Sequence, residues 1–140
     1  DYPYVLSAGE RRAFTANTII RDPEWRRRDP DGLLRMSAED AERLGVSSGD
    51  HVRLTTRAGG VDVQVEVTDT MRAGHLSLPN GLGLTVEDVT GDPVTTGIAT
   101  NTLTDHRDRD EWAGTPWHKH VPATINLIPE LTKTGSPSAQ

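Results

Sequence analysis

Four valines alternate with polar residues between positions 61 and 67, in the order Val-Asp-Val-Gln-Val-Glu-Val. A period of two is the spacing of side chains that point to one face of a β-strand. The segment therefore predicts a strand with one buried face and one face in water. Ala58, Gly59 and Gly60 stand directly before it, so we expect a hairpin to a preceding strand at residues 51–57.

Other short apolar segments extend this pattern along the chain. Further strands are expected at residues 4–6, 33–36, 75–78 and 121–128. Pro122 favours an edge position for the last strand, because proline cannot donate a ladder hydrogen bond. Residues 85–98 show no regular pattern and are expected to be irregular. Many short strands with a single short helix indicate a β-barrel with small helical insertions.

The one helix is expected over residues 38–44. Ser37 precedes it, and because its hydroxyl can accept the amide of Asp40, we expect Ser37 to be the N-cap. Glu39 and Asp40 complement the positive end of the helix dipole. Gly45 follows as a left-handed stop.

Length, charge and cysteine content limit the function classes. The 140 residues predict one domain over residues 1–131, followed by a disordered tail at 132–140. The formal charge of −6 argues against nucleic acid as a partner. No apolar run is long enough to cross a membrane, so no membrane partner is expected. Cysteine is absent, which excludes disulfides and thiolate metal sites and fits a reducing compartment, so we expect a cytoplasmic location.

Three polar clusters that are far apart in the sequence could line one site. The first follows the first strand and places adjacent Arg11 and Arg12 among small residues, a composition typical of an anion-binding strand end. The second covers residues 101–104 and the third covers residues 115–119. Their separation in sequence means that only a folded chain can bring them together.

Metal binding and self-contained catalysis are both disfavoured by the spacing of the polar residues. His118 and His120 alternate along an extended segment, but no third ligand accompanies them, so no metal site is expected. No nucleophile elbow, paired carboxylates or HExxH spacing is present, so no catalytic residue is assigned. His51, His75 and His106 are interpreted as surface or strand residues.

The segment from Ser37 to Leu54 resembles the helix-turn-strand signature of double-psi β-barrels. Adaptor-binding domains of some hexameric ATPases carry a similar unit, so a protein-interaction module stays open as an alternative. The later motifs Arg57-Ala-Gly-Gly-Val61, Arg72-Ala-Gly74 and Leu76-Ser-Leu-Pro79, with the clusters at Asn101 and Pro116, narrow the choice. Together they resemble the C-terminal molybdopterin dinucleotide-binding domain of the dimethyl sulfoxide reductase family, closest to formate-dehydrogenase-like members.

This resemblance covers residues 2–128 and implies both a fold and a function. The fold would be mainly β, a double-psi β-barrel of the aspartate-decarboxylase-like kind with one or more short helices. The domain would bind and close over a bis(molybdopterin guanine dinucleotide) cofactor carrying molybdenum or tungsten. Upstream domains of the same parent polypeptide, an oxidoreductase, would supply the metal ligand and most substrate contacts. The isolated domain would therefore be inactive.

The motifs of the family also imply a set of cofactor-binding residues. These are Ala8, Gly9, Glu10, Arg11, Arg12, Phe14, Asn17, Thr18, Asn80, Gly81, Asn101, Thr104, His118 and Lys119. Arginine and lysine can bind a pyrophosphate, and glycine lets the backbone approach it closely. Asparagine can pair with the donor and acceptor edges of guanine and pterin, while His118 can hydrogen-bond or stack beside Lys119.

Overall fold

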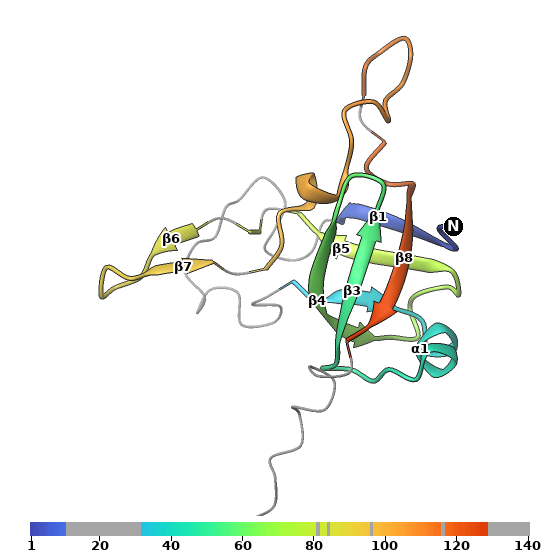
Figure 1. Cartoon of the computed structure of the whole chain (residues 1–140), viewed down its shortest axis with the longest axis horizontal. Helices are drawn as coiled ribbons and strands as arrows, with labels where there is room; N and C mark the ends of the chain where they lie inside the picture. Colours follow the sequence, from blue (N-terminus) through green and yellow to red (C-terminus); the bar gives the residue numbers. More distant parts are fainter. Residues whose placement is uncertain (11–31, 81, 84, 96, 116, 129–140) are drawn as a thin grey trace, which may run out of the picture.

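The computed structural model describes residues 1–10, 32–80, 82–83, 85–95, 97–115 and 117–128. Six strands in the order β1-β5-β2-β4-β3-β8 close into a barrel (Figure 1). Strands β1 and β5 are parallel, as are β2 and β4, whereas the other neighbours are antiparallel. The expectation of a mainly β barrel is therefore confirmed. The strands are β1 (Tyr4–Glu10), β2 (Leu34–Met36), β3 (His51–Thr56), β4 (Gly60–Val67), β5 (His75–Pro79) and β8 (Val121–Leu127).

The core of the barrel contains the valines of β4. Val63 and Val65 are buried, and Val61 and Val67 pack partly buried against the same cluster. Removing this apolar surface from water is the main force that holds the strands together. The barrel strands also contribute the buried residues Tyr4, Leu6, Ala8, Leu34, Met36, Val52, Leu54, Leu76, Leu78, Val121, Ala123 and Ile125.

Helix α1 (Ala38–Leu44) begins and ends where the sequence predicts. The hydroxyl of Ser37 accepts the amide of Asp40 at 3.1 Å, and Gly45 is left-handed with φ 72°. The carboxylate of Asp40 is fully buried and accepts the amide of Gly74 at 2.7 Å and the hydroxyl of Ser37 at 2.9 Å. Asp40 thus ties α1 to the turn before β5, a role beyond its effect on the helix dipole.

Two details of the barrel differ from expectation. Strand β1 continues past residues 4–6 to Glu10, because its pairing with β5 extends as far as Pro79. The edge position expected from Pro122 is wrong, since β8 pairs with both β1 and β3. The pairing with β3 stops at Ala123, so Pro122 lies opposite a residue of β1 but of no other described strand. The N–H that proline lacks therefore costs no hydrogen bond to β3.

The segment expected to be irregular, residues 85–98, contains a hairpin, so that expectation is wrong. Strand β6 (Thr85–Glu87) pairs antiparallel with β7 (Pro93–Thr95) in a separate two-stranded sheet that projects from the barrel (Figure 1). Strands of three residues are too short to show a period of two. The 3-10 helix η2 (Thr100–Leu103) follows.

Two expectations concern the ends and the environment of the chain. The tail at 132–140 lies outside the described residues, so the domain bound at 131 stays a prediction. In the described ranges, no helix has both the length and the apolar character that a membrane crossing needs.

Candidate functional site

A cavity of about 500 Å³ opens where the C-terminal ends of β1 and β5 meet η2 and the residues before β8. Because β1 and β5 are parallel neighbours, their ends lie at the same edge of the barrel. Four separate parts of the sequence converge there. The lining residues are Ala8, Asn80, Thr100, Asn101, Thr104, Asp105, His106 and His118.

The end of β1 holds His118 in place. The amide of Ala8 donates to the carbonyl of His118 at 2.7 Å. Gly9 has φ +130°, and a Cβ atom at this position would lie 3.3 Å from Cδ2 of His118 and 4.0 Å from Cβ of Asn80. The strand register also shifts between Ala8 and Glu10. Gly9 therefore permits both the bulge and the close approach of the imidazole ring.

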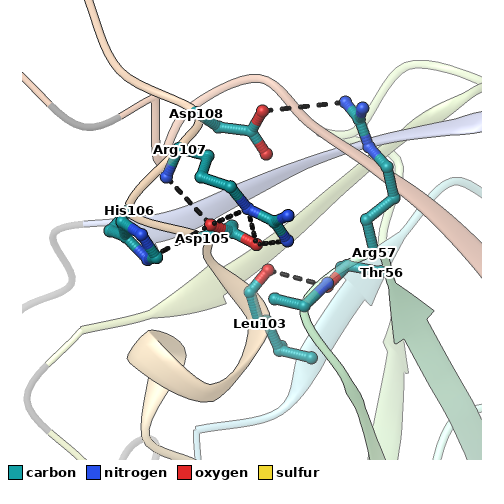
Figure 2. A network of polar contacts seen from close by, with 8 residues as sticks. Thr56, Arg57, Leu103, Asp105, His106, Arg107 and Asp108 are labelled. Atoms are coloured by element: carbon teal, nitrogen blue, oxygen red, sulfur yellow. Dashed lines mark hydrogen bonds and ion pairs between the residues drawn. The ribbon is translucent and has the colours of Figure 1, made fainter.

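The turn between β3 and β4 fixes η2 at the cavity. The buried hydroxyl of Thr56 donates to the carbonyl of Leu103 at 2.8 Å, as Figure 2 shows. A Cβ atom at Gly59 would lie 3.1 Å from the carbonyl oxygen of Thr102, so this turn packs closely on η2. These contacts set the position of Asn101, which lies on η2 and lines the cavity.

A charged network forms one part of the cavity wall (Figure 2). The guanidinium of Arg107 donates from Nη2 to Oδ2 of Asp105 at 2.6 Å and from Nε to Oδ1 at 3.0 Å. These bonds hold the pKa of Asp105 well below its usual range and raise the pKa of Arg107. Nδ1 of His106 lies 3.4 Å from Oδ1 of Asp105. The carboxylate is therefore ionised at neutral pH, with its charge offset by Arg107.

Part of this wall is not predicted by the sequence. Thr100 and Asp105 are not among the expected site residues, and His106 is expected to be a surface or strand residue. The side chain of His106 is indeed exposed, but the residue also lines the cavity. The only available signal was the position of these residues directly beside the Asn101 cluster.

The expected site residues fall into three groups: those at or beyond the border of the cavity, those that line it, and those outside the described residues. Gly9 borders the cavity, Glu10 ends β1, and Lys119 is exposed and is not among the lining residues. The cavity brings together Ala8, Asn80, Asn101, Thr104 and His118. Outside the described residues lie Arg11, Arg12, Phe14, Asn17, Thr18 and Gly81.

The chemistry of the cavity wall suits the binding of a polar ring system. The amides of Asn80 and Asn101 each offer donors and an acceptor, and Thr104 adds a hydroxyl. His118 offers a ring that can stack or hydrogen-bond. Amides and hydroxyls do not titrate near neutral pH, so Asn80, Asn101 and Thr104 can bind a ligand but cannot act as general acids or bases. No cluster of three or more His, Cys, Asp or Glu that could hold a metal ion occurs within the described part of the chain.

Comparison with known families and proteins identifies similar chains. A family model described as "Molydopterin dinucleotide binding domain" matches residues 4–122. A tetrathionate reductase chain of Archaeoglobus fulgidus is 31% identical over 82 residues, which are 59% of this chain and 7% of that protein. The alpha chain of F420-dependent formate dehydrogenase 1 of Methanococcus maripaludis is 26% identical over 96 residues, 66% of this chain and 14% of that protein. The chain thus spans a small part of these relatives.

Among solved structures, acetylene hydratase from Pelobacter acetylenicus is similar with a TM-score of 0.73. The match covers 91% of this chain and 18% of that chain, at 18% sequence identity. At this identity the likeness concerns the fold alone. It confirms the double-psi β-barrel expected from the sequence.

Proposed function

Because the chain belongs to the molybdopterin dinucleotide-binding domain family, as its motifs indicated, we propose that it binds and closes over a molybdopterin guanine dinucleotide in a molybdenum or tungsten oxidoreductase. Upstream domains of the same parent polypeptide would complete the cofactor site. The small share of each relative that the chain spans supports this division. The isolated chain would be folded but inactive.

One observation carries the proposal. Five residues expected from the family motifs, which come from four separate parts of the sequence, line one cavity. The parallel pairing of β1 and β5 brings Ala8 and Asn80 to one edge of the barrel, and Asn101 and His118 add polar groups there from two further parts of the sequence. The donor set also fits the ligand, because guanine and pterin each present an aminopyrimidinone edge with both donors and acceptors.

Each group at the site has a distinct binding role in this proposal. Asn80 and Asn101 pair with the ring edges, and His118 stacks or hydrogen-bonds beside them. Arg11 and Arg12 bind the pyrophosphate through charge-assisted hydrogen bonds. Lys119 adds a nearby positive charge. The metal of the bound cofactor supplies the redox chemistry, while the residues of this chain bind and orient the cofactor.

The alternative, a protein-interaction module like the adaptor-binding domains of hexameric ATPases, is not favoured. The double-psi barrel fold suits both functions. The family match over residues 4–122 and the polar cavity suit the cofactor. A cytoplasmic location stays a prediction that depends on the absence of cysteine.

A titration with guanosine diphosphate, the nucleotide end of the cofactor, tests the site. We expect NMR amide shifts of the labelled chain to concentrate at Asn80, Asn101 and His118. Asn101→Ala should weaken binding roughly tenfold, the value of one well-formed hydrogen bond. Asn126→Ala is the matched control, because Asn126 is exposed on β8 and lies outside the cavity lining. Equal weakening by both variants, or shifts remote from the cavity, would contradict the site.

Activity assays test the proposed division of labour. The isolated chain should neither oxidise formate nor reduce nitrate or tetrathionate, because the metal ligand would lie elsewhere. The parent polypeptide should release guanine nucleotide on acid hydrolysis. Turnover by the isolated chain alone would overturn the proposal that it closes a site built mainly by other domains.

A further inference from the structure

Two projections leave the barrel, and η2 joins them in the sequence. The first is the β6–β7 hairpin, and the second is the finger, which we define as residues 105–115 and 117 (Figure 1). Each has an exposed apolar residue at its tip. Val89 is fully exposed in the first, and Trp112 is 95% exposed in the second.

Both tips are held by hydrogen bonds rather than by apolar packing. In the finger, Oδ1 of Asp110 accepts the amide of Trp112 at 2.9 Å and that of Ala113 at 2.7 Å. In the β6–β7 hairpin, Oδ1 of Asp88 accepts the amides of Thr90 at 2.8 Å and Asp92 at 3.0 Å. The backbone of each tip is thus ordered while its apolar side chain faces water. Such preorganised presentation lowers the entropy cost of docking.

The finger is continuous with the cavity wall. Asp105 and His106 begin it, and both line the cavity. The amide of Trp117 donates to the carbonyl of Asp108 at 2.9 Å and closes its base, while His118 directly after it lines the cavity. A domain that covers the open side of the cavity would therefore meet the finger.

The charges of the projections indicate the chemistry of their partner. Residues 85–95 contain three acidic residues and no lysine or arginine. In the finger, four acidic residues outnumber two arginines, and Arg107 is paired with Asp105. A complementary surface would offer apolar pockets surrounded by lysine or arginine.

We propose, on the basis of the proposed function, that Val89 and Trp112 dock into apolar, basic-rimmed pockets on the upstream domains of the parent polypeptide. Docking at both tips clamps those domains over the cavity. The upstream domains are the partner because, in the proposed function, they supply the other wall of the cofactor site. The relatives are also far longer than this chain, which spans 7% and 14% of them. Tryptophan at the tip suits this role, since buried tryptophans dominate the energy of many interfaces.

Hydroxyl-radical footprinting compares Trp112 in the 140-residue chain and in the parent polypeptide. Docking predicts a fall of roughly tenfold in its oxidation rate in the parent, as expected for a desolvated anchor. Met71, half-buried in the turn before β5, is the control and keeps its rate. Guanine nucleotide released from the same parent sample is measured in parallel.

The two readouts separate the docking proposal from the cofactor proposal. Protection of Trp112 without bound guanine nucleotide means that docking stands and the cofactor proposal fails. Bound nucleotide with Trp112 as reactive as in the isolated chain means that docking fails and the cofactor proposal stands. Protection with bound nucleotide supports both, and the absence of both overturns both.

A second measurement gives the strength of the contact. A protease site is placed in the parent polypeptide directly before the residue that is Asp1 of this chain. Cleavage there frees the chain, and its dissociation from the upstream domains can then be followed. Trp112→Ala should raise Kd roughly 30-fold and Val89→Ser about fivefold, whereas Trp112→Phe should retain most of the affinity. Leu127→Ala, at an exposed apolar residue of β8, is the control. If the Trp112→Ala chain bound the upstream domains with the same Kd as the unsubstituted chain, the proposal would be overturned.

Discussion

The barrel and the tips of the two projections from the segment between β5 and β8 hold their apolar residues in opposite ways. In the barrel, Leu54 and Val65 are fully buried, whereas Val89 and Trp112 in the segment face water. The barrel is therefore ordered mainly by apolar burial, and the two tips by local hydrogen bonds. Between them, Leu103 of η2 is fully buried and belongs to the barrel core. The buried residues of the barrel therefore determine the stability of the fold, whereas the exposed residues at the tips are free to contact a partner. A side chain that contributes nothing to the core can be replaced without unfolding the chain.

The cavity lies at the boundary between the two regions. Ala8 and Asn80 come from the ends of barrel strands, whereas Asn101 and Asp105 belong to the segment. The contact between Thr56 and Leu103 and the close packing at Gly59 fix one region on the other near η2. Ligand binding should therefore respond to changes in both regions, and global stability mainly to changes in the barrel.

The largest effect is expected from Leu54→Ala in the barrel. Removing a fully buried leucine side chain leaves a cavity and should cost about 3 kcal/mol of the free energy of unfolding. The corresponding fall in Tm is about 10 °C, measurable by calorimetry. Leu127→Ala makes the same chemical change at an exposed position of β8 and should cost less than about 0.5 kcal/mol. Similar losses of unfolding free energy at both positions would show that burial in the barrel is not what stabilises the fold.

The sequence predicted the barrel far better than the segment, for a physical reason. Burial on one face of a strand imposes a period of two, which is visible in residues 61–67. The three-residue strands β6 and β7 depend on pairing with each other and leave no such period. In the candidate site, Asn101 and His118 were found by resemblance, whereas Asp105 joins the wall through the course of the chain after η2, which no local pattern encodes.

Gly9→Ala tests how the barrel shapes the site and should have the next largest effect. The added Cβ atom would press on His118 and face a strained φ of +130°, so stability should fall by about 1 to 2 kcal/mol. Gly74→Ala is the matched control, because φ is +82° and no atom lies within 4 Å of the added Cβ. Both should lower Tm, but only Gly9→Ala should weaken guanosine diphosphate binding. Equal loss of binding would show that His118 is not positioned by Gly9.

Asp110 gives the segment a pH dependence that the barrel should not share. Hydrogen bonds from the amides of Ala113 and Trp112 lower the pKa of Asp110. The ionised carboxylate therefore stabilises the turn fully at pH values above the usual pKa of aspartate. This stabilisation is lost as the pH falls through the lowered pKa of Asp110. NMR should show the amides of Trp112 and Ala113 shifting with acid while the barrel amides stay unchanged.

Asp110→Asn keeps an acceptor oxygen but cannot titrate in this range. The turn should persist in this variant and its acid response should disappear. Glu111→Gln removes the neighbouring exposed carboxylate and should leave the response intact. An acid response that survives in Asp110→Asn would mean that another group controls the finger.

The smallest effect is expected where an ion pair joins the two regions. Nη2 of Arg57 lies 3.9 Å from Oδ1 of Asp108, and both side chains are partly exposed to water (Figure 2). Solvent screens such a pair, so Arg57→Ala should change the free energy of unfolding by less than about 0.5 kcal/mol. Thr56→Val, which removes the buried hydrogen bond to Leu103, should cost about 1 to 2 kcal/mol. If chemical denaturation showed the reverse order, electrostatics rather than the buried hydrogen bond would hold the segment to the barrel, and Trp112 would then lose its fixed position at high salt.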